Sequence, residues 1–364
     1  MILHLYFARR FAGTFVFVLS IFFGILLLID LVEQVRRFEG ENVGLIRLIG
    51  LTLLSVPETL YTILPLITII AALTLFLSLA RTSELVVSRA AGRSAFRSLL
   101  GPALVTFLIG VLAVAALNPI VAATSGQFDR VSDELRGEVT SALSLTRSGV
   151  WLRQGNGEGQ TVIQAVRSNE DGTRLTGVTF LGFDVKGAPT YRLEGDSARL
   201  EDGAWRVRNA KRWDFADQNP EQDAISVSQT SVPSSLTASR IADSFGDPST
   251  IPVWELPAFI SDLQASGFSA RRHIVFLQSQ LAMPVLLVAM VLIGAAFTMR
   301  HTRLGRSGPS VLVALSIGFG LFFLGDFAQI LGETGRIPAM LAAWGPPVAA
   351  CLLPLGLILH WEDG

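Results

Sequence analysis

The sequence predicts an α+β membrane protein with six transmembrane helices, three before and three after an inserted β-rich domain. Three observations lead to this fold class. Half of the 364 residues are hydrophobic and only 16% are charged, whereas soluble domains carry about 25% charged residues. The charges are unevenly spread, because six stretches contain no Asp, Glu, Lys or Arg. Between the third and fourth stretches, short segments of strand-forming residues alternate with polar turns.

Each uncharged stretch is long enough to cross a bilayer, which requires about 20 apolar helical residues. The six stretches are residues 11–29, 59–79, 98–128, 273–299, 307–325 and 337–361. The first is too long for the apolar core of a signal peptide and no small-residue cleavage site follows it, so we expect a retained helix. The third exceeds one span, and we expect its helix to stop near Asn118 and Pro119, where the chain becomes polar.

Basic residues in the short loops predict the orientation. Arg9 and Arg10 precede the first helix, and arginines dominate the loops after the second and fourth helices. The loops on the other side mix arginines with Asp and Glu. Because cytoplasmic loops are enriched in Lys and Arg, both termini are expected in the cytoplasm and the inserted domain outside.

The inserted segment is expected to form a β domain. Seven short strand-like stretches are separated by turn signals such as Gly155-Asn156-Gly157 and Asp202-Gly203, which is typical of a meandering sandwich or a jelly roll. We therefore divide the chain into three parts. Residues 1–128 hold three helices, residues 129–266 a β-jelly-roll domain with a connecting helix, and residues 267–364 three more helices.

The residue inventory argues against an enzyme. The sequence has no phosphate-binding loop, no nucleophile elbow and no His-Glu-x-x-His pair, and its four histidines lack metal-ligand spacing. The single cysteine, Cys351, excludes internal disulfides. A net charge of −1 gives no electrostatic support for binding nucleic acid. We expect neither catalysis nor a cofactor in this chain.

The basic loop between the second and third helices is the first candidate site. Within residues 81–97, Glu84 is a lone acid among arginines, placed in the first turn of a short helix where a carboxylate is favourable. Leu85 and Val86 would add an apolar patch with Arg89 beside it. Such a helix fits either docking into a groove of a partner protein or lying on anionic lipid. The residues alone leave both alternatives open.

A second candidate site is the outer end of the first helix, where Asp30, Glu33, Arg36 and Arg37 follow one another. Arginine pairs bidentately with phosphate, so recognition of an anionic amphiphile is one interpretation. A solvated loop or a headgroup anchor is the other. Asp326 occupies the matching outer end of the fifth helix.

Glu58, beside Pro57, is the one acid that we place within a predicted membrane helix, the second. Acids inside a membrane are energetically costly and often mark functional sites. The uncharged run begins immediately after Glu58, however. We therefore favour an acid at headgroup level beside a packing proline.

Several motifs resemble the LptF/LptG (YjgP/YjgQ) family of lipopolysaccharide export permeases, and LptG more closely than LptF. They are EQVRRFEG at residues 33–40, SVPE at 55–58 and SELVVSRAAG at 83–92. The resemblance covers nearly the whole chain. It implies a transmembrane subunit of an ABC transporter in the inner membrane of a Gram-negative bacterium. Such a transporter extracts lipopolysaccharide and passes it to a periplasmic β bridge that serves outer-membrane biogenesis.

The resemblance also implies partners and residue roles. ATP and Mg would be used by a separate LptB-like ATPase dimer, and an LptF-like permease, LptC and LptA would complete the system. Residues 81–97 would be the coupling helix, with Glu84 as the coupling acid. Arg36 and Arg37 would contact the phosphorylated sugars of lipopolysaccharide as it enters between helices one and five. The sequence departs from the family at Asp30, where relatives can carry a base.

The β domain is expected to carry lipid through its interior. Phe180, Trp205 and Val207 would face this path, while Arg206 and Arg208 point away because side chains alternate along a strand. The competing interpretation is a closed, dry core filled by the same apolar side chains. For the whole chain, the alternative to a permease is a non-transporting inner-membrane scaffold or chaperone whose β domain binds envelope proteins.

Overall fold

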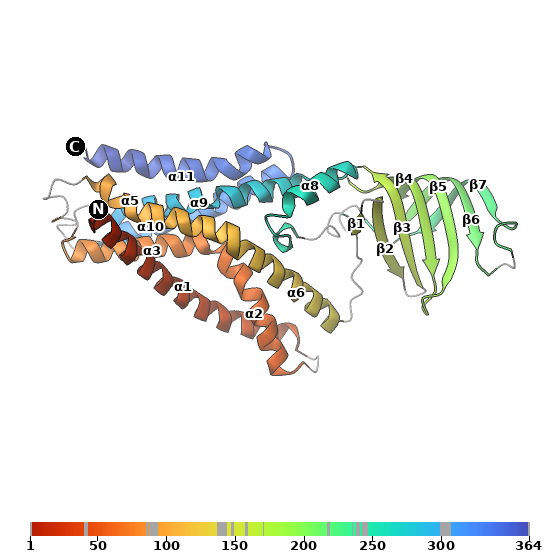
Figure 1. Cartoon of the computed structure of the whole chain (residues 1–364), viewed down its shortest axis with the longest axis horizontal. Helices are drawn as coiled ribbons and strands as arrows, with labels where there is room; N and C mark the ends of the chain where they lie inside the picture. Colours follow the sequence, from red (N-terminus) through yellow and green to blue (C-terminus); the bar gives the residue numbers. More distant parts are fainter. Residues whose placement is uncertain are drawn as a thin grey trace. The chain divides into compact units, whose positions relative to one another are not determined.

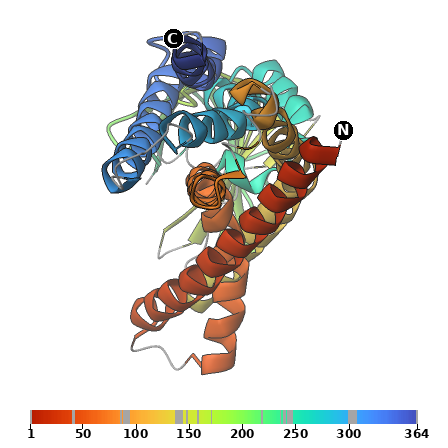
Figure 2. The same ribbon diagram turned by 90° about the vertical axis from the view of Figure 1, so that its left-hand side faces the viewer.

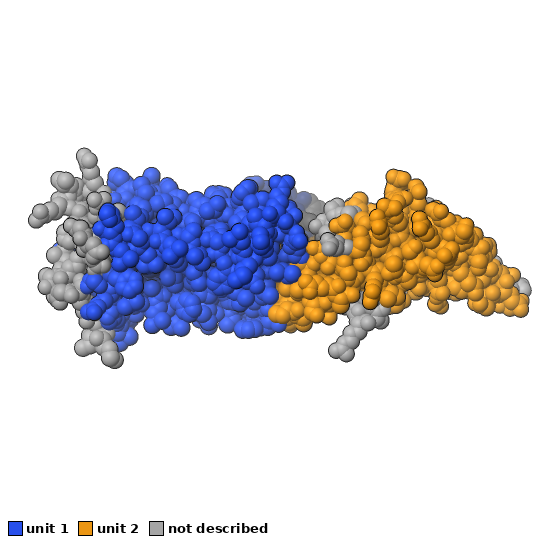
Figure 3. Space-filling view, turned by 90° about the horizontal axis from the view of Figure 1, so that it is seen from above, with its two compact units in different colours: residues 1–129, 249–254, 271–364 blue, residues 130–248, 255–270 orange. Residues whose placement is uncertain are grey.

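The chain forms two compact units, which Figure 3 colours separately. The computed structural model describes residues 2–39, 43–84, 87, 94–136, 144–146, 149–156, 159–169, 171–216, 219–234, 236–237, 241, 247–298 and 307–362. The helical unit comprises Met1–Asp129, Ser249–Trp254 and Arg271–Gly364. The β unit comprises Arg130–Pro248 and Glu255–Ala270.

Long apolar helices make up the helical unit (Figure 1). They are α1 (Ile2–Arg37), α2 (Leu45–Thr62), α3 (Leu64–Arg81), α5 (Ala95–Leu112), the π-helix η1 (Ala113–Leu117), α6 (Asn118–Arg136), α9 (Arg271–Thr298), α10 (Ser307–Glu333) and α11 (Ala339–Glu362). Among the described residues, seven helices are long and apolar enough to cross a membrane. This is one more than the uncharged stretches predict.

The additional apolar helix is α2. Arg47 and Glu58 interrupt its apolar sequence, so a search for uncharged stretches finds only the part that follows Glu58. Ile63 alone separates α2 from α3, and Pro65 lies in the first turn of α3, a position where proline fits a helix well. The single predicted helix at residues 59–79 is therefore two consecutive helices.

The prediction that the third helix stops near Asn118 and Pro119 is wrong. The helix continues from α5 through η1 into α6 and ends at Arg136. A proline inside a regular α-helix removes one hydrogen bond and clashes with the carbonyl four residues earlier. Here the widened turn at Ala113–Leu117 precedes the proline, so the chain passes it without ending the helix.

Two helices form the centre of the helical unit. In their most apolar stretches, 72% of the residues of α9 and 61% of those of α3 are buried, against 11% for α1 and for α10. The helix α9 packs against α3, α5, α10 and α11, while α1 packs against α2, α3 and α5. Figure 2 shows α1 running obliquely past α3, and in Figure 1 α1 and α2 diverge from α9, α10 and α11 toward the end of α1.

The β unit contains one antiparallel sheet whose strands follow the order β1-β2-β3-β4-β5-β6-β7. The strands are β1 (Ser144–Thr146), β2 (Gly149–Asn156), β3 (Gly159–Ser168), β4 (Arg174–Phe183), β5 (Pro189–Glu201), β6 (Ala204–Asp214) and β7 (Ile225–Pro233), and helix α8 (Leu256–Ala265) follows them. The predicted antiparallel β domain is confirmed. Its predicted jelly-roll topology is not confirmed, since the described strands each pair with their neighbours in sequence, whereas a jelly roll interleaves two Greek keys.

The predicted alternation along β6 is confirmed. Trp205 and Val207 are completely buried, and Arg206 and Arg208 are exposed. Phe180 of β4 is also completely buried, and its ring lies edge-on to that of Trp205 with 6.5 Å between the centroids. The sheet thus has an apolar inner face built from several strands and a charged outer face.

Candidate functional site

Glu84 lies in a polar network between α1 and the segment that follows α3. Nη1 of Arg10 donates to Oε1 of Glu84 at 2.6 Å, and Nη2 of Arg10 donates to the hydroxyl of Ser78 at 3.0 Å. The hydroxyl of Tyr6 donates to Oε2 of Glu84 at 3.0 Å, and that of Thr82 donates to Oε1 at 2.8 Å. The carboxylate therefore receives donors from α1 and from Thr82, the residue that follows α3.

Helical spacing explains how these side chains meet. Tyr6 and Arg10 are four residues apart on α1, and Ser78 and Thr82 are four residues apart at the end of α3, so each pair lies on one helix face. Ser83 then adopts a φ of 59°, a left-handed conformation that is uncommon for residues other than glycine. This turn ends α3 and is followed directly by the carboxylate.

The environment of Glu84 keeps it ionised. Burial raises the pKa of its carboxyl. The hydrogen bonds from Arg10, Thr82 and Tyr6, together with the charge of Arg10, lower this pKa by more than burial raises it, so the net pKa lies below the ordinary 4.5. The two partners of the ion pair are 28% and 30% exposed, so the pair is only partly shielded from solvent. At neutral pH the network contains a full negative and a full positive charge.

The remaining residues predicted for this loop, Leu85, Val86 and Arg89, lie outside the described residues. Sequence reasoning identified Glu84 but missed its partners within the chain. The sequence pattern predicts only the orientation from Arg10, and it predicts no role for Tyr6. A tyrosine and an arginine four residues apart, just before a stretch of 19 uncharged residues (11–29), were the available signal.

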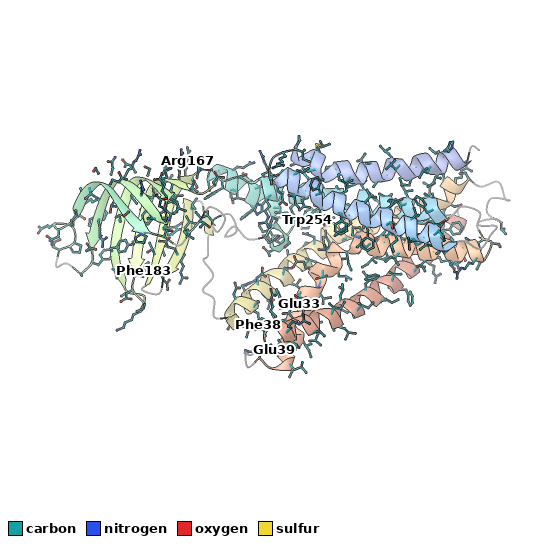
Figure 4. The ribbon with its side chains drawn as sticks, turned by 180° about the vertical axis from the view of Figure 1, so that it is seen from behind. Glu33, Phe38, Glu39, Arg167, Phe183 and Trp254 are labelled. Carbon is teal, nitrogen blue, oxygen red and sulfur yellow. The ribbon has the colours of Figure 1, made fainter. Side chains whose placement is uncertain are left out.

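The structure does not gather the four residues predicted for substrate binding at one place. Glu33, Arg36 and Arg37 are exposed in the last turns of α1, where Figure 4 labels Glu33. The guanidinium of Arg37 lies 5.9 Å from the ring centroid of Phe128. None of these three residues lines the cavity to which Asp326 contributes.

That cavity has a volume of about 330 Å³ and lies within the helical unit. Helices α2, α3, α6, α9, α10 and α11 all contribute side chains to it. The polar residues of its wall are Glu58, Tyr61, Thr62, Asn118, Ser249, Ser279, Gln280, Asp326 and Gln329, and the remainder are apolar or glycine. Among the described residues that line the cavity, none is Lys, Arg or His. Its acids, amides and hydroxyls suit a group that donates hydrogen bonds and is attached to an apolar one.

Glu58 is a wall residue of this cavity with two hydroxyl donors. Ser125 of α6 donates to Oε2 at 2.8 Å, and Ser249 donates to Oε1 at 3.1 Å. That Glu58 lies at headgroup level beside a packing proline stays a prediction, to which the structure adds these two contacts within the chain. Asp30 is likewise engaged within the chain, because the hydroxyl of Ser55 donates to its carboxylate.

The inner face of the β sheet is partly enclosed because the sheet curls. The side chain of Gln154 on β2 donates to the carbonyl of Pro233 at 2.9 Å and accepts from the hydroxyl of Ser234 at 2.6 Å. A side chain of the second strand therefore contacts the end of the seventh. A cavity of about 480 Å³ opens beside this contact. The indole N–H of buried Trp205 finds no acceptor among the described residues.

Comparison with known proteins adds to this geometry. A model of the family described as lipopolysaccharide export system permease LptF/LptG matches residues 5–360. The chain is 26% identical over 343 residues to the lipopolysaccharide export system permease protein LptG of Escherichia coli (strain K12), which covers 92% of this chain and 91% of that protein. It is 22% identical over 369 residues to LptG of Haemophilus influenzae, with 98% and 96% covered.

Proposed function

Because the chain belongs to the LptF/LptG family of lipopolysaccharide export permeases, we propose that it is an LptG-like transmembrane subunit of an ABC transporter. The transporter extracts lipopolysaccharide from the inner membrane and delivers it to a periplasmic β bridge. In this proposal α2 and α3 act as one of six membrane crossings, since Ile63 alone separates them. Both termini lie in the cytoplasm and the β unit lies in the periplasm.

The unequal burial of the apolar helices carries the proposal. Only 11% of the most apolar stretch is buried in α1 and in α10, and both expose large apolar side chains such as Phe17 and Phe323. Apolar surface of this extent requires lipid or another protein around it. A second, LptF-like permease that faces α1 and α10 would close an apolar space large enough for the acyl chains of the substrate.

The charged residues lie at two places that suit different parts of the substrate. Arg36 and Arg37 are exposed at the end of α1, where they would pair with phosphate groups, with Glu33 one turn earlier. Asp326 shares its cavity with Glu58, and two carboxylates there disfavour a phosphate group by charge repulsion. We assign phosphate recognition to the arginines and contact with sugar hydroxyl or amide groups to the cavity.

ATP hydrolysis belongs to a separate LptB-like dimer that binds Mg and ATP. Glu84, Leu85, Val86 and Arg89 are the residues proposed to dock on it. The ion pair between Arg10 and Glu84 supports a coupling role, because it connects this loop to α1. A movement of the loop would therefore also move α1, whose exposed face borders the substrate in this proposal.

The β unit is the proposed next station for lipid. Phe180, Trp205 and Val207 form part of its apolar inner face, and the sheet is closed at one point by the side chain of Gln154 rather than by backbone pairing. An acyl chain that passes this point would break the hydrogen bonds between Gln154 and the end of β7. Unpaired strand edges recruit further strands, which provides a means of joining LptC and LptA.

Purification from the native membrane tests the proposal. We expect an ATPase dimer and a second permease in stoichiometric amounts. Glu84→Ala removes the charge-assisted hydrogen bond that we propose Glu84 makes to the ATPase, worth about 1.5–3 kcal/mol, and should weaken ATPase association by about tenfold or more. Glu39→Ala is the matched control, because this acid lies just after the opposite end of α1, and it should leave the complex unchanged.

Two results would contradict the proposal. Recovery of the chain with envelope proteins and without an ATPase would identify it as a membrane scaffold. Unchanged complex yield and unchanged transport in Glu84→Ala would remove the docking role of that residue.

A further inference from the structure

The long helix from α5 to α6 contains a carbonyl group that lacks its usual donor. In an α-helix the N–H of residue 119 donates to the carbonyl of residue 115, but Pro119 has no N–H. The helix widens into a π-turn over Ala113–Leu117 at the same place. Such turns are rare inside α-helices and occur frequently at functional sites.

Residues Ser249–Trp254 supply donors at this point. The indole Nε1 of Trp254 donates to the carbonyl of Ala115 at 3.1 Å. The backbone N–H of Val253 donates to Oδ1 of Asn118 at 2.9 Å, and the side chain of Asn118 is buried. One donor therefore replaces the one that proline lacks, and another binds the side chain immediately before the proline.

The same segment is held at its other end by Glu58. Ser249 donates to one carboxylate oxygen of Glu58, and Ser125 of α6 donates to the other. The segment is thus connected to α2 and, at two heights, to the helix that contains the π-turn. We call Ser249–Trp254, together with these contacts, the clasp.

The place of the clasp in the chain indicates its use. The chain leaves the helical unit after Asp129 and rejoins it at Arg271. Between these residues, Ser249–Trp254 is the segment assigned to the helical unit, and residues of the β unit precede and follow it directly. Any displacement of the π-turn that moves Trp254 is therefore passed along the backbone to Glu255 and α8.

We propose that the clasp transmits conformational changes of the helical unit to the β unit, with Trp254 as the positioning residue. This inference rests on the proposed transport function and names the residues that connect its two stages. The π-turn is the element through which such a change would act on the clasp, because a rearrangement of Ala113–Leu117 would move the carbonyl that Trp254 binds. The clasp would then release the segment before α8.

Two substitutions test the contact from opposite sides. Trp254→Phe keeps an aromatic ring and removes the N–H, and the ring is 68% exposed, so its packing changes little. Pro119→Ala restores an N–H that competes for the carbonyl of Ala115. Trp344→Phe is the matched control, because the indole of Trp344 donates to Gln278 at 3.0 Å elsewhere in the helical unit.

The full complex is reconstituted in proteoliposomes that contain lipopolysaccharide. A photocrosslinker at Val35 reports binding at the end of α1, and one at Phe180 reports arrival in the β unit. Trp254→Phe and Pro119→Ala should leave ATP hydrolysis and crosslinking at Val35 unchanged. Both should lower ATP-dependent crosslinking at Phe180 by about fivefold, the equilibrium effect of one lost hydrogen bond. Trp344→Phe should behave as the unsubstituted chain.

The other outcomes overturn the inference. Normal arrival at Phe180 in both variants shows that the clasp transmits nothing. An equal loss in Trp344→Phe, or a parallel loss of ATP hydrolysis and of crosslinking at Val35, shows general destabilisation instead. If the unsubstituted complex crosslinks lipopolysaccharide at neither position, the proposed function itself fails, and that result is recognisable before any variant is compared.

Discussion

In the helical unit many large apolar side chains are exposed, whereas in the β unit those of Phe180 and Trp205 are completely buried. The exposed large apolar residues of the first unit lie mostly on α1, α5, α10 and α11, and the exposed residues of the second include the arginines of β6. Since apolar surface is stable only away from water, one chain is adapted to two different surroundings.

The polar contacts of the two units differ in the same way. The outer face of the sheet carries exposed ion pairs such as Arg192–Glu194, and pairs of this kind contribute little stability. In the helical unit the polar groups of Arg10, Glu58 and Asn118 each bind groups from other segments of the chain. Polar residues of the helical unit determine which segments contact one another, while the charged residues on the outer face of the sheet keep the β unit soluble.

The largest expected effect comes from emptying the β core. Phe180→Ala should destabilise the β unit by about 3–5 kcal/mol, as for other buried phenylalanines. Val166→Ala on β3, where the side chain is exposed, should change stability by less than about 0.5 kcal/mol. Urea-dependent proteolysis of the purified full chain measures both. Equal resistance of the two variants would show that the inner face is loosely packed.

A charge on the exposed face of α10 should have the next largest effect. Phe323→Arg should cost about 2.5–3.5 kcal/mol of membrane insertion if this residue lies near the bilayer centre, and Phe323→Leu should cost almost nothing. The yield in the membrane fraction reports the difference. Similar yields of the two variants would indicate that this face of α10 borders water and not lipid or protein.

Breaking the ion pair of α1 should have a smaller effect. Arg10→Ala leaves Glu84 without its cation and should cost about 1–2 kcal/mol, because the pair is charged but partly exposed. The expected readout is ATP hydrolysis that continues with reduced transport. The exchange Arg10→Glu with Glu84→Arg should restore transport if the two residues act on each other. Failure of the exchange, with a normal Arg10→Ala variant, would show that Glu84 acts only toward the ATPase.

The smallest effect on stability is expected for the arginines at the end of α1. Arg36→Glu combined with Arg37→Glu should change the stability of the chain by less than about 0.5 kcal/mol, since both side chains are exposed. It should nevertheless lower lipopolysaccharide crosslinking near the end of α1 without abolishing ATP hydrolysis. Normal crosslinking would reduce both arginines to surface anchors.

Local patterns predicted the parts of this fold that depend on neighbouring residues. The alternation of Trp205 and Val207 with Arg206 and Arg208 determines the faces of β6, and uncharged stretches locate most of the apolar helices. The same rules failed where two local signals compete. Glu58 interrupts the apolar sequence of α2, so the search for uncharged stretches missed this helix. Pro119 predicted the end of a helix, but the helix continues past it after the π-turn.

The candidate site was predicted less completely because its contacts join distant parts of the chain. Arg10 and Glu84 are separated by 74 residues, and Trp254 and Ala115 by 139. No periodicity reports such a pairing. Glu84 was identified by the motif around it, but the residues that hold it, and the donor that replaces the N–H of Pro119, became visible only with the fold.

Lipid arrival on the inner face of the β sheet tests the central claim most directly. The complex is reconstituted with lipopolysaccharide, and photocrosslinkers are placed at Phe180, which is buried, and at Arg206, which is exposed on the outer face. We expect crosslinks at Phe180 that require ATP hydrolysis, and few at Arg206 under any condition. Equal labelling of the two positions, or none at Phe180 while the complex hydrolyses ATP, would contradict a transport path through this chain.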